Sequence, residues 1–362
     1  MSIPNAEPFH LAGNEIAILM IHGFSGSPVS IRPWAEGLHA EGYSIYAPRL
    51  PGHGTTWSEM NETTWQDWYQ EVEKEFESIR VKHRRIFVAG FSMGGALALH
   101  LAAERGREIE GLLLVNPSIG DDRLIMSFVP LIKYLIPSVA GRRTDVAAPN
   151  PPRHSYGRTP LRALHSLQKL WRKVRSELPA IDLPLMIGYS IQDHVVDPKF
   201  SEIVIDNISS VDIREIIFEN SFHNVALDYD LSQLVSESHT FVRDVLTGEV
   251  ATESLIDEEF DSIVAGLSLD ESTPTDYLDE LEETSVEVYA GDNKPLPTLT
   301  IVQRAALVGV IGGPSYILVT ALSPLDLLGI GFWPGAIALI AGVITFFWQM
   351  KPEPDDENGV AL

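Results

Sequence analysis

A serine flanked by glycines lies where an apolar run gives way to a run of small residues. Residues 86–99 read Ile-Phe-Val-Ala-Gly-Phe-Ser-Met-Gly-Gly-Ala-Leu-Ala-Leu, so Ser92 stands in a Gly-x-Ser-x-Gly pattern. Gly90 and Gly94 permit the sharp turn from a strand into a helix that exposes a serine hydroxyl at the helix N-terminus. We therefore predict that Ser92 is a nucleophile rather than a structural serine.

A nucleophilic serine needs an acid that orients its general base, and in this strand-turn-helix setting the acid follows the serine in the chain. Asp193 closely follows a predicted strand at residues 185–188, at the carboxyl end where the functional groups of a parallel sheet gather. Asp197 is the alternative acid, but Pro198 behind it is typical of a helix start. We predict that Asp193 is the acid.

The general base is expected to be a histidine that follows the acid. His223 comes after a predicted strand at residues 213–218 and is our candidate. The chain has eleven histidines; His53 and His100 are interpreted as loop and helix structure, and no two histidines have the spacing of metal ligands. The absence of cysteine also excludes thiolate chemistry and cysteine-bound metals, so we predict neither a metal nor a cofactor.

The oxyanion that forms when a serine attacks a carbonyl needs N–H donors. His22-Gly-Phe24 ends a predicted strand, and a turn that contains Gly23 can aim the backbone N–H of Phe24 into the site. The N–H of Met93, directly after the serine, is the expected second donor. His22 itself is interpreted as a structural hydrogen-bonding residue.

Short apolar runs alternate with longer amphipathic stretches from residue 15 to about 247, which is typical of a mainly parallel sheet with helices on both faces. Residues 65–80 and 161–178 have apolar side chains at spacings of three and four, which predicts amphipathic helices. The second helix falls in residues 120–180, which interrupt the regular alternation of predicted strands and helices. We name these residues the cap segment and expect them to form an inserted cap. The sequence predicts an α/β domain whose strands are residues 16–21, 43–47, 86–89, 112–115, 185–188 and 213–218.

The chain is strongly acidic, and its charge is unevenly distributed. Its 362 residues carry a formal net charge of −24, from 26 Lys and Arg against 50 Asp and Glu. This sign argues against a nucleic-acid partner, because a phosphate backbone is bound by basic side chains. Residues 249–293 hold 15 acidic residues and no basic one, which is typical of a flexible linker.

Two uncharged stretches, residues 305–322 and 327–348, follow the acidic stretch, and each is close to the length that spans a bilayer. Neither has a polar face, which favours membrane spans over a buried hairpin of a soluble domain. Basic residues flank only the outer ends of the pair, and the N-terminus lacks a secretory signal. We therefore expect a multi-pass protein with two spans and with both termini in the cytoplasm.

Taken together, these motifs resemble the α/β-hydrolase family, and within it the bacterial carboxylesterase and monoacylglycerol lipase branch. The resemblance covers residues 10–247. It implies an eight-stranded sheet, a small cap over the active site, a triad of Ser92, Asp193 and His223, and an oxyanion hole formed by Phe24 and Met93. The motifs that carry it are Gly90-Phe-Ser-Met-Gly-Gly95, His22-Gly-Phe24, Leu50-Pro-Gly-His-Gly54, Asp193-x-Val-Val-x-Pro198 and Phe222-His223.

The expected organisation has four parts, and the first is the hydrolase domain with its cap. The second is an acidic flexible linker, the third is a pair of transmembrane helices at about residues 302–322 and 327–349, and the fourth is a polar tail. The boundaries of the four parts are residues 1–248, 249–298, 299–350 and 351–362.

The resemblance implies a serine esterase that cleaves carboxylic esters through an acyl-enzyme. We expect lipid-like monoesters such as monoacylglycerols, because residues 124–136 of the cap segment are almost wholly apolar and the enzyme is expected at the cytoplasmic face of a membrane. Packing between cap and core explains these apolar residues equally well. Acyl thioesterase, acyltransferase and non-catalytic ligand-binding functions would use the same residues and stay open, and the sequence does not indicate the oligomeric state.

The cap segment is also unusually basic. Residues 142–175 hold nine Lys and Arg, and Asp145 is their single acid. A solvated helix face accounts for such a run. The alternatives are that it docks on the anionic cytoplasmic leaflet, so that membrane lipids are partners beside the ester substrate, or that it docks on the acidic linker.

Overall fold

The computed structural model describes residues 3–141, 144–248, 309, 312, 313, 316 and 333–349. The chain divides into two units, Met1–Leu267 and Ser268–Leu362. The expected linker at residues 249–298 and the expected tail at residues 351–362 lie outside the described residues.

Seven strands form the central sheet of the first unit, in the order β1-β3-β2-β4-β5-β8-β9. All neighbouring strands are parallel except β1, which pairs antiparallel with β3. The central strands are buried along almost their whole length, as expected when helices cover both faces of a parallel sheet. The strands of this sheet are β1 (Phe9–Leu11), β2 (Ile16–Ile21), β3 (Ser44–Ala47), β4 (Arg85–Phe91), β5 (Gly111–Val115), β8 (Leu185–Ser190) and β9 (Ile213–Phe218).

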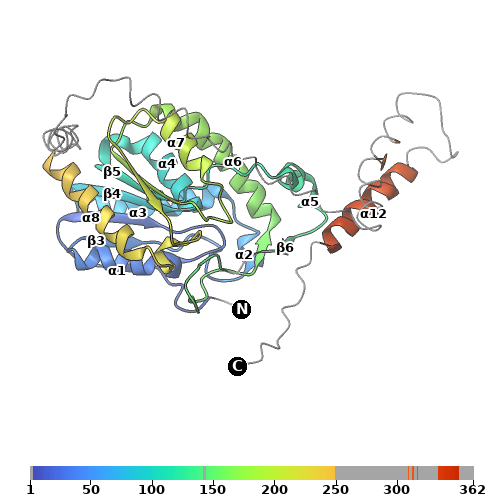
Figure 1. Ribbon diagram of the computed structural model, residues 1–362, viewed down its shortest axis with the longest axis horizontal. Helices are drawn as coiled ribbons and strands as arrows, with labels where there is room; N and C mark the ends of the chain where they lie inside the picture. Colours follow the sequence, from blue (N-terminus) through green and yellow to red (C-terminus); the bar gives the residue numbers. More distant parts are fainter. Residues whose placement is uncertain are drawn as a thin grey trace, which may run out of the picture. The chain divides into compact units, whose positions relative to one another are not determined.

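Helices cover both faces of this sheet (Figure 1). On one face α1 packs against α8, and the indole N–H of Trp34 donates to Oγ of Ser238 at 3.0 Å. On the other face α4 packs against β4, with α3 and α6 beside it. The helices of the first unit are α1 (Arg32–Ala40), α2 (Trp57–Met60), α3 (Trp65–Arg80), α4 (Met93–Arg105), α5 (Val129–Ile132), α6 (Leu161–Glu177), α7 (Lys199–Asn207) and α8 (Leu231–Thr247).

The structure confirms the six predicted strands and both predicted helices, with bounds that differ from the expected ones by at most two residues at either end. The expected eight-stranded sheet is wrong by one strand in the described part of the chain. Residues 3–8, which precede β1, contain Pro4 and Pro8 and include a turn at residues 4 and 5 but no strand, since proline is disfavoured inside strands.

The cap segment lies between β5 and β8 in the chain. It contains α5, α6 and a small antiparallel pair of strands, β6 (Ser138–Ala140) and β7 (Arg158–Pro160). Its long helix α6 packs against α4, the helix that begins after Ser92. A hydrogen bond of 2.8 Å between His100 Nδ1 and Glu177 Oε2 joins these two helices.

The described part of the second unit consists of α12 (Trp333–Gln349), which carries no charged residue, and four residues of the predicted span 302–322. Among the described residues, no helix combines the length and the apolar character needed to cross a membrane. A Cβ atom added to Gly309 would lie 2.6 Å from the carbonyl oxygen of Ala338, and one added to Gly313 would lie 2.6 Å from that of Gly335. The backbone at these two glycines therefore contacts α12 directly.

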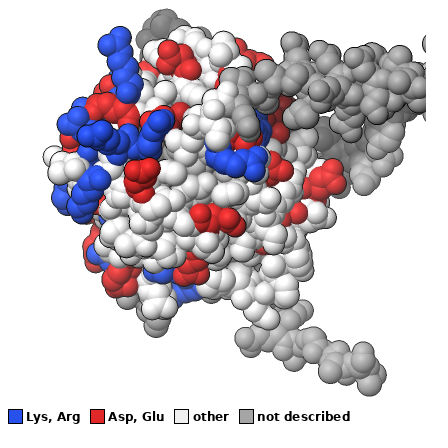
Figure 2. Space-filling view, turned by 90° about the vertical axis from the view of Figure 1, so that its left-hand side faces the viewer, with Lys and Arg blue, Asp and Glu red and all other residues white. Residues whose placement is uncertain are grey.

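Basic side chains on the face shown in Figure 2 gather toward one edge, where acidic side chains are interleaved with them. Several of the basic side chains of the described residues form ion pairs with acidic neighbours on the surface. Examples are Arg80 with Glu108 at 2.6 Å and Arg105 with Glu73 at 2.9 Å.

Candidate active site

Ser92 stands between β4 and α4 in a backbone conformation that few non-glycine residues adopt. Its φ is 55°, and its backbone N–H donates to the carbonyl of Val115 at 3.0 Å. A Cβ atom on Gly94 would lie 2.0 Å from the carbonyl oxygen of Ile21, and one on Gly90 would lie 2.5 Å from that of Gly94. Glycine is required at both positions because the turn brings backbone against backbone.

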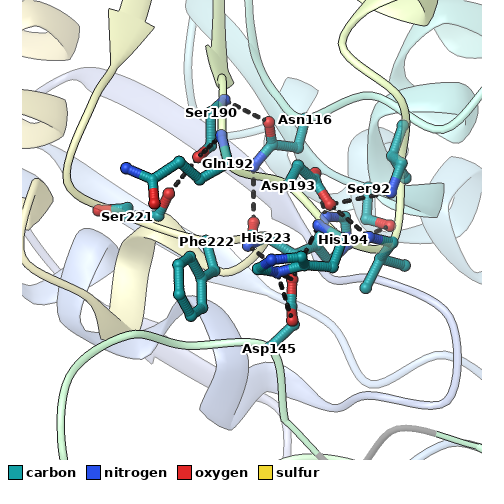
Figure 3. Close-up of polar contacts among 12 residues, drawn as sticks. Ser92, Asn116, Asp145, Ser190, Gln192, Asp193, His194, Ser221, Phe222 and His223 are labelled. Atoms are coloured by element: carbon teal, nitrogen blue, oxygen red, sulfur yellow. Dashed lines mark hydrogen bonds and ion pairs between the residues drawn. The ribbon is translucent and has the colours of Figure 1, made fainter. Parts of the chain in front are cut away.

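The structure brings together the three predicted residues Ser92, His223 and Asp193. The hydroxyl of Ser92 donates to Nε2 of His223 at 3.0 Å, and Nδ1–H of His223 donates to Oδ2 of Asp193 at 2.6 Å (Figure 3). Ser92 is 7% exposed and His223 is 8% exposed. The imidazole is thus held in the tautomer whose Nε2 can accept the serine proton.

Asp193 and not the alternative acid Asp197 contacts the histidine. The second oxygen of Asp193 accepts the N–H groups of Val195 at 2.7 Å and Val196 at 2.9 Å. Asp197 is half exposed and accepts the N–H of Lys199 at the start of α7, a hydrogen bond that lowers the pKa of its carboxyl. Asp197 therefore stabilises the helix start.

The turn after β2 contacts Ser92. A Cβ atom on Gly23 would lie 3.1 Å from Cβ of Ser92, so a side chain at residue 23 would crowd the serine. Within the described residues, the N–H groups of Phe24 and Met93 donate to no backbone or side-chain acceptor. Met93 is also the first residue of α4, where the helix dipole favours negative charge.

His22 fixes the direction of the Phe24 N–H. Nδ1–H of His22 donates to the carbonyl of Gly23 at 3.0 Å, while its Nε2 accepts the N–H of Leu50 at 3.2 Å. The Gly23 carbonyl and the Phe24 N–H belong to one planar trans peptide and point in opposite directions, so holding the carbonyl orients the N–H. Burial lowers the pKa of His22 to about 4, which keeps the ring neutral, and the structural interpretation of His22 is confirmed.

The structure places three further residues near the triad that the sequence analysis did not propose for the active site. They are Asn116, Asp145 and His154. Asn116 follows β5, donates from Nδ2 to the carbonyl of His223 at 2.6 Å and accepts the N–H of Ser190 at 2.8 Å. Its place after a buried strand was a usable signal. His154 of the cap segment is buried, and burial, with a smaller effect from His223, lowers its pKa.

The apolar residues of 124–136 differ in their exposure to solvent. Val129 and Ile132 are buried, whereas five large side chains point into solvent. The exposed set is Leu124, Phe128, Leu131, Tyr134 and Leu135. Packing of the cap therefore accounts for only part of this segment.

Several basic residues of the cap segment have partners within the fold. Arg175 donates to the carbonyl of Ile119 at 2.9 Å, and Lys173 pairs with Glu177. Arg158 donates to Oγ of Ser138 at 2.8 Å.

Among the described residues, no three His, Asp or Glu side chains are grouped so that they could hold a metal ion.

Comparisons with known proteins place the first unit in a family. The family model described as serine aminopeptidase, S33, matches residues 13–230. The thermostable monoacylglycerol lipase of Bacillus sp. (strain H-257) is 34% identical to this chain over 242 residues, which are 66% of this chain and 95% of that protein. The carboxylesterase of Bacillus subtilis (strain 168) is 23% identical, over 67% of this chain and 98% of that protein.

Solved structures agree with this assignment. A structure from work on LipS and LipT, two metagenome-derived lipolytic enzymes, is 31% identical, has a TM-score of 0.65 and covers 67% of this chain and 100% of that chain. A soluble variant of the monoglyceride lipase of Saccharomyces cerevisiae shares the fold, with 20% identity, a TM-score of 0.55, and coverage of 66% of this chain and 90% of that chain. The chain belongs to this α/β-hydrolase family and is a carboxylic ester hydrolase of the monoacylglycerol lipase and esterase type.

Proposed function

We propose that the chain hydrolyses lipid-like monoesters, such as monoacylglycerols, with Ser92 as the nucleophile, His223 as the general base and Asp193 as the orienting acid. One observation carries the proposal, namely the hydrogen-bonded series from Ser92 through His223 to Asp193 at the carboxyl ends of β4, β9 and β8. A serine, a histidine and a carboxylate in this relation are the groups that acyl transfer requires.

In the first half of the reaction, Nε2 of His223 takes the hydroxyl proton of Ser92 while Oγ attacks the carbonyl carbon of the ester. Negative charge then develops on the carbonyl oxygen, which the N–H groups of Phe24 and Met93 stabilise. The tetrahedral intermediate collapses when the imidazolium returns its proton to the departing alcohol oxygen. An acyl group is left on Ser92.

In the second half, His223 removes a proton from a water molecule that attacks the acyl carbonyl. The same two N–H groups stabilise the second oxyanion. Collapse of this intermediate transfers the proton from His223 back to Oγ and releases the carboxylic acid. Asp193 keeps Nδ1 protonated throughout, so that Nε2 is the atom that exchanges protons.

The proposed substrate class is supported by the monoacylglycerol lipase of Bacillus sp. This chain matches 95% of the length of that lipase. The test uses p-nitrophenyl esters from acetate to palmitate together with 1-monoacylglycerols. Turnover of medium or long acyl chains by the wild type, with loss in Ser92→Ala, supports the proposal. Activity confined to acetate contradicts the lipid assignment.

Acyl thioesterase and acyltransferase activities would use the same residues, and the same preparation separates them. Acyl-coenzyme A and a monoacylglycerol of equal chain length are offered at equal concentration, and the released acid is measured with and without added alcohol. A higher kcat/KM for the thioester favours the thioesterase. Transfer of the acyl group to the alcohol in preference to water favours the acyltransferase.

We also propose that residues 302–322 and 327–349 anchor the enzyme in a membrane as a helical hairpin, with the hydrolase domain and both termini in the cytoplasm. The contacts of Gly309 and Gly313 with the α12 backbone support it, since small residues allow membrane helices to approach closely. Flotation of the full chain and of a chain ending at residue 248 with lipid vesicles tests the anchor. Equal flotation of both chains contradicts it.

A further inference from the structure

A carboxylate from the cap segment reaches the two loops that carry Asp193 and His223. Asp145 is buried, and its Oδ2 accepts the N–H of His194 and the N–H of His223, each at 3.2 Å (Figure 3). Nδ1 of His194 lies 3.1 Å from Oδ1 of Asp145. The N–H of Asn224 donates to the backbone carbonyl of Asp145 at 3.1 Å.

These contacts connect the two loops to each other through the cap. His194 directly follows the acid, and His223, the base, lies 30 positions after Asp193 in the chain. A single oxygen atom of Asp145 binds one N–H from each loop. The spacing between the two loops therefore depends on the position of this oxygen.

A second buried carboxylate, that of Asp228, binds the same part of the cap segment. Oδ2 of Asp228 accepts the N–H of Ala147 at 2.7 Å and the N–H of Phe222 at 2.9 Å. Its Oδ1 accepts the N–H of Ala148 at 2.9 Å. Ala147 and Ala148, two and three positions after Asp145, are thus connected through Asp228 to the loop that contains Phe222 and His223.

We propose that Asp145 is a positioning residue that sets the alignment of Asp193 and His223 and makes the cap part of the support of the triad. The proposal rests on the catalytic roles proposed above for Asp193 and His223. Removing the side chain leaves two loop N–H groups without this acceptor, that of His223 at a buried position and that of His194 at a partly buried one, so the loops move to find other partners. Small displacements of reacting groups cost large factors in rate.

Within the Asp145 side chain, the oxygen at the Oδ2 position is the atom that accepts both loop N–H groups. In Asp145→Asn the amide oxygen can occupy that position and accept both backbone N–H groups, while the amide nitrogen faces the ring of His194. In Asp145→Ala no acceptor is left. Asp121→Asn is a matched control, since Asp121 is also a carboxylate of the cap segment but accepts hydrogen bonds from Arg123.

The test measures kcat and KM for one monoacylglycerol, together with the rate at which a fluorophosphonate labels Ser92. We expect kcat and the labelling rate to fall roughly ten- to a hundredfold in Asp145→Ala, with KM within about threefold of the wild type. Asp145→Asn should recover kcat to within about threefold of the wild type. Asp121→Asn should match the wild type.

Three results overturn the proposal: an unchanged kcat in Asp145→Ala, an effect on KM alone, or an equal loss of kcat in Asp145→Ala and Asp145→Asn. If near-UV circular dichroism shows that Asp145→Ala is not folded, Asp145→Glu replaces it, because it keeps the charge but moves the oxygens by one methylene. The same loss of kcat is then expected, and an unchanged kcat overturns the proposal. A wild type that neither turns over nor reacts with the probe refutes the proposed function instead.

Discussion

Nε2 of His223 lies 3.0 Å from Oγ of Ser92, although 131 positions separate the two residues in the chain. Ser92 follows β4 and His223 follows β9, and two other strands, β5 and β8, lie between these strands in the sheet. Loops at the carboxyl edge must therefore cross the ends of β5 and β8 for the contact to form. Asn116 and Asp193, which follow those two strands, hold the loop of His223.

Substitution of each aspartate in turn should show which of Asp193 and Asp197 is the acid that orients His223. In Asp193→Asn the side chain no longer holds the imidazole in the productive tautomer, and we expect kcat to fall by about 10,000-fold. Asp197→Asn is the matched control, since Asp197 is half exposed and contacts Lys199 at the start of α7. Its kcat should stay within about twofold of the wild type. Equal losses in both variants would contradict the assignment of the acid.

Asn116→Ala is expected to lower both stability and activity. The substitution leaves the N–H of Ser190 and the carbonyl of His223 without their buried partner, which costs about 2 kcal/mol in the free energy of unfolding. The loop of His223 is loosened, so kcat should fall about tenfold. Urea unfolding and monoacylglycerol kinetics measure the two effects. Asn207→Ala, on the exposed side of α7, serves as the control, and a match between the two variants would refute the role of Asn116.

Gly94→Ala should destabilise the fold because the added Cβ atom would lie 2.0 Å from the carbonyl oxygen of Ile21. Overpacking of this kind costs about 3 kcal/mol. In Gly106→Ala the added Cβ atom finds its nearest neighbour, a methyl group of Leu183, at 3.9 Å, so the free energy of unfolding should change by less than about 1 kcal/mol. Denaturant titration compares the two, and similar stabilities would mean that the turn at Ser92 is less tight than described.

Acidification from pH 7 to pH 5 should destabilise the fold through its buried histidines, among which His22 and His53 have strongly lowered pKa values and His154 adds a further contribution. Burial lowers the pKa of His22 to about 4 and that of His53 well below its ordinary value. An unfolded histidine titrates near pH 6.5, so below that pH the unfolded chain binds protons that the folded chain does not. The free energy of unfolding then falls with falling pH, by about 1.4 kcal/mol per pH unit for each histidine.

Urea unfolding at pH 7, 6 and 5 measures this slope. His53→Asn keeps a donor near the carbonyl of Pro51, which Nδ1 of His53 contacts at 3.0 Å, and removes one titrating group. Its slope should be smaller than that of the wild type by about 1.4 kcal/mol per pH unit between pH 6 and pH 5, which is the contribution of one histidine. An unchanged slope would show that His53 is already protonated in the folded state at pH 5.

The elements that the sequence predicted well are those with a strong local pattern. Helix α3 has the predicted bounds because six apolar side chains repeat along one face between residues 65 and 80, and the buried strands are continuous apolar runs. Strands β1, β6 and β7 have three residues each, too few for a period to be recognised. Their pairing depends on neighbours distant in the chain.

The site was predictable where its residues follow strands and not where they come from the cap. Ser92, Asp193 and His223 each stand just after an apolar run in the expected chain order, so a local pattern pointed to them. Asp145 has no such pattern, because it lies 49 residues before His194 and 78 before His223. Only the fold of the cap segment brings it to these loops.

Ser92 is the proposed nucleophile, and covalent labelling can identify it without a substrate. The purified full chain is treated with a fluorophosphonate and digested, and the modified residue is located by mass spectrometry. Ser201→Ala, which removes another buried serine hydroxyl, from α7, is the matched control for Ser92→Ala. We expect one modification, at Ser92, in the wild type and in Ser201→Ala, and none in Ser92→Ala. Modification of a different residue, or equal labelling of Ser92→Ala, would show that Ser92 is not the nucleophile.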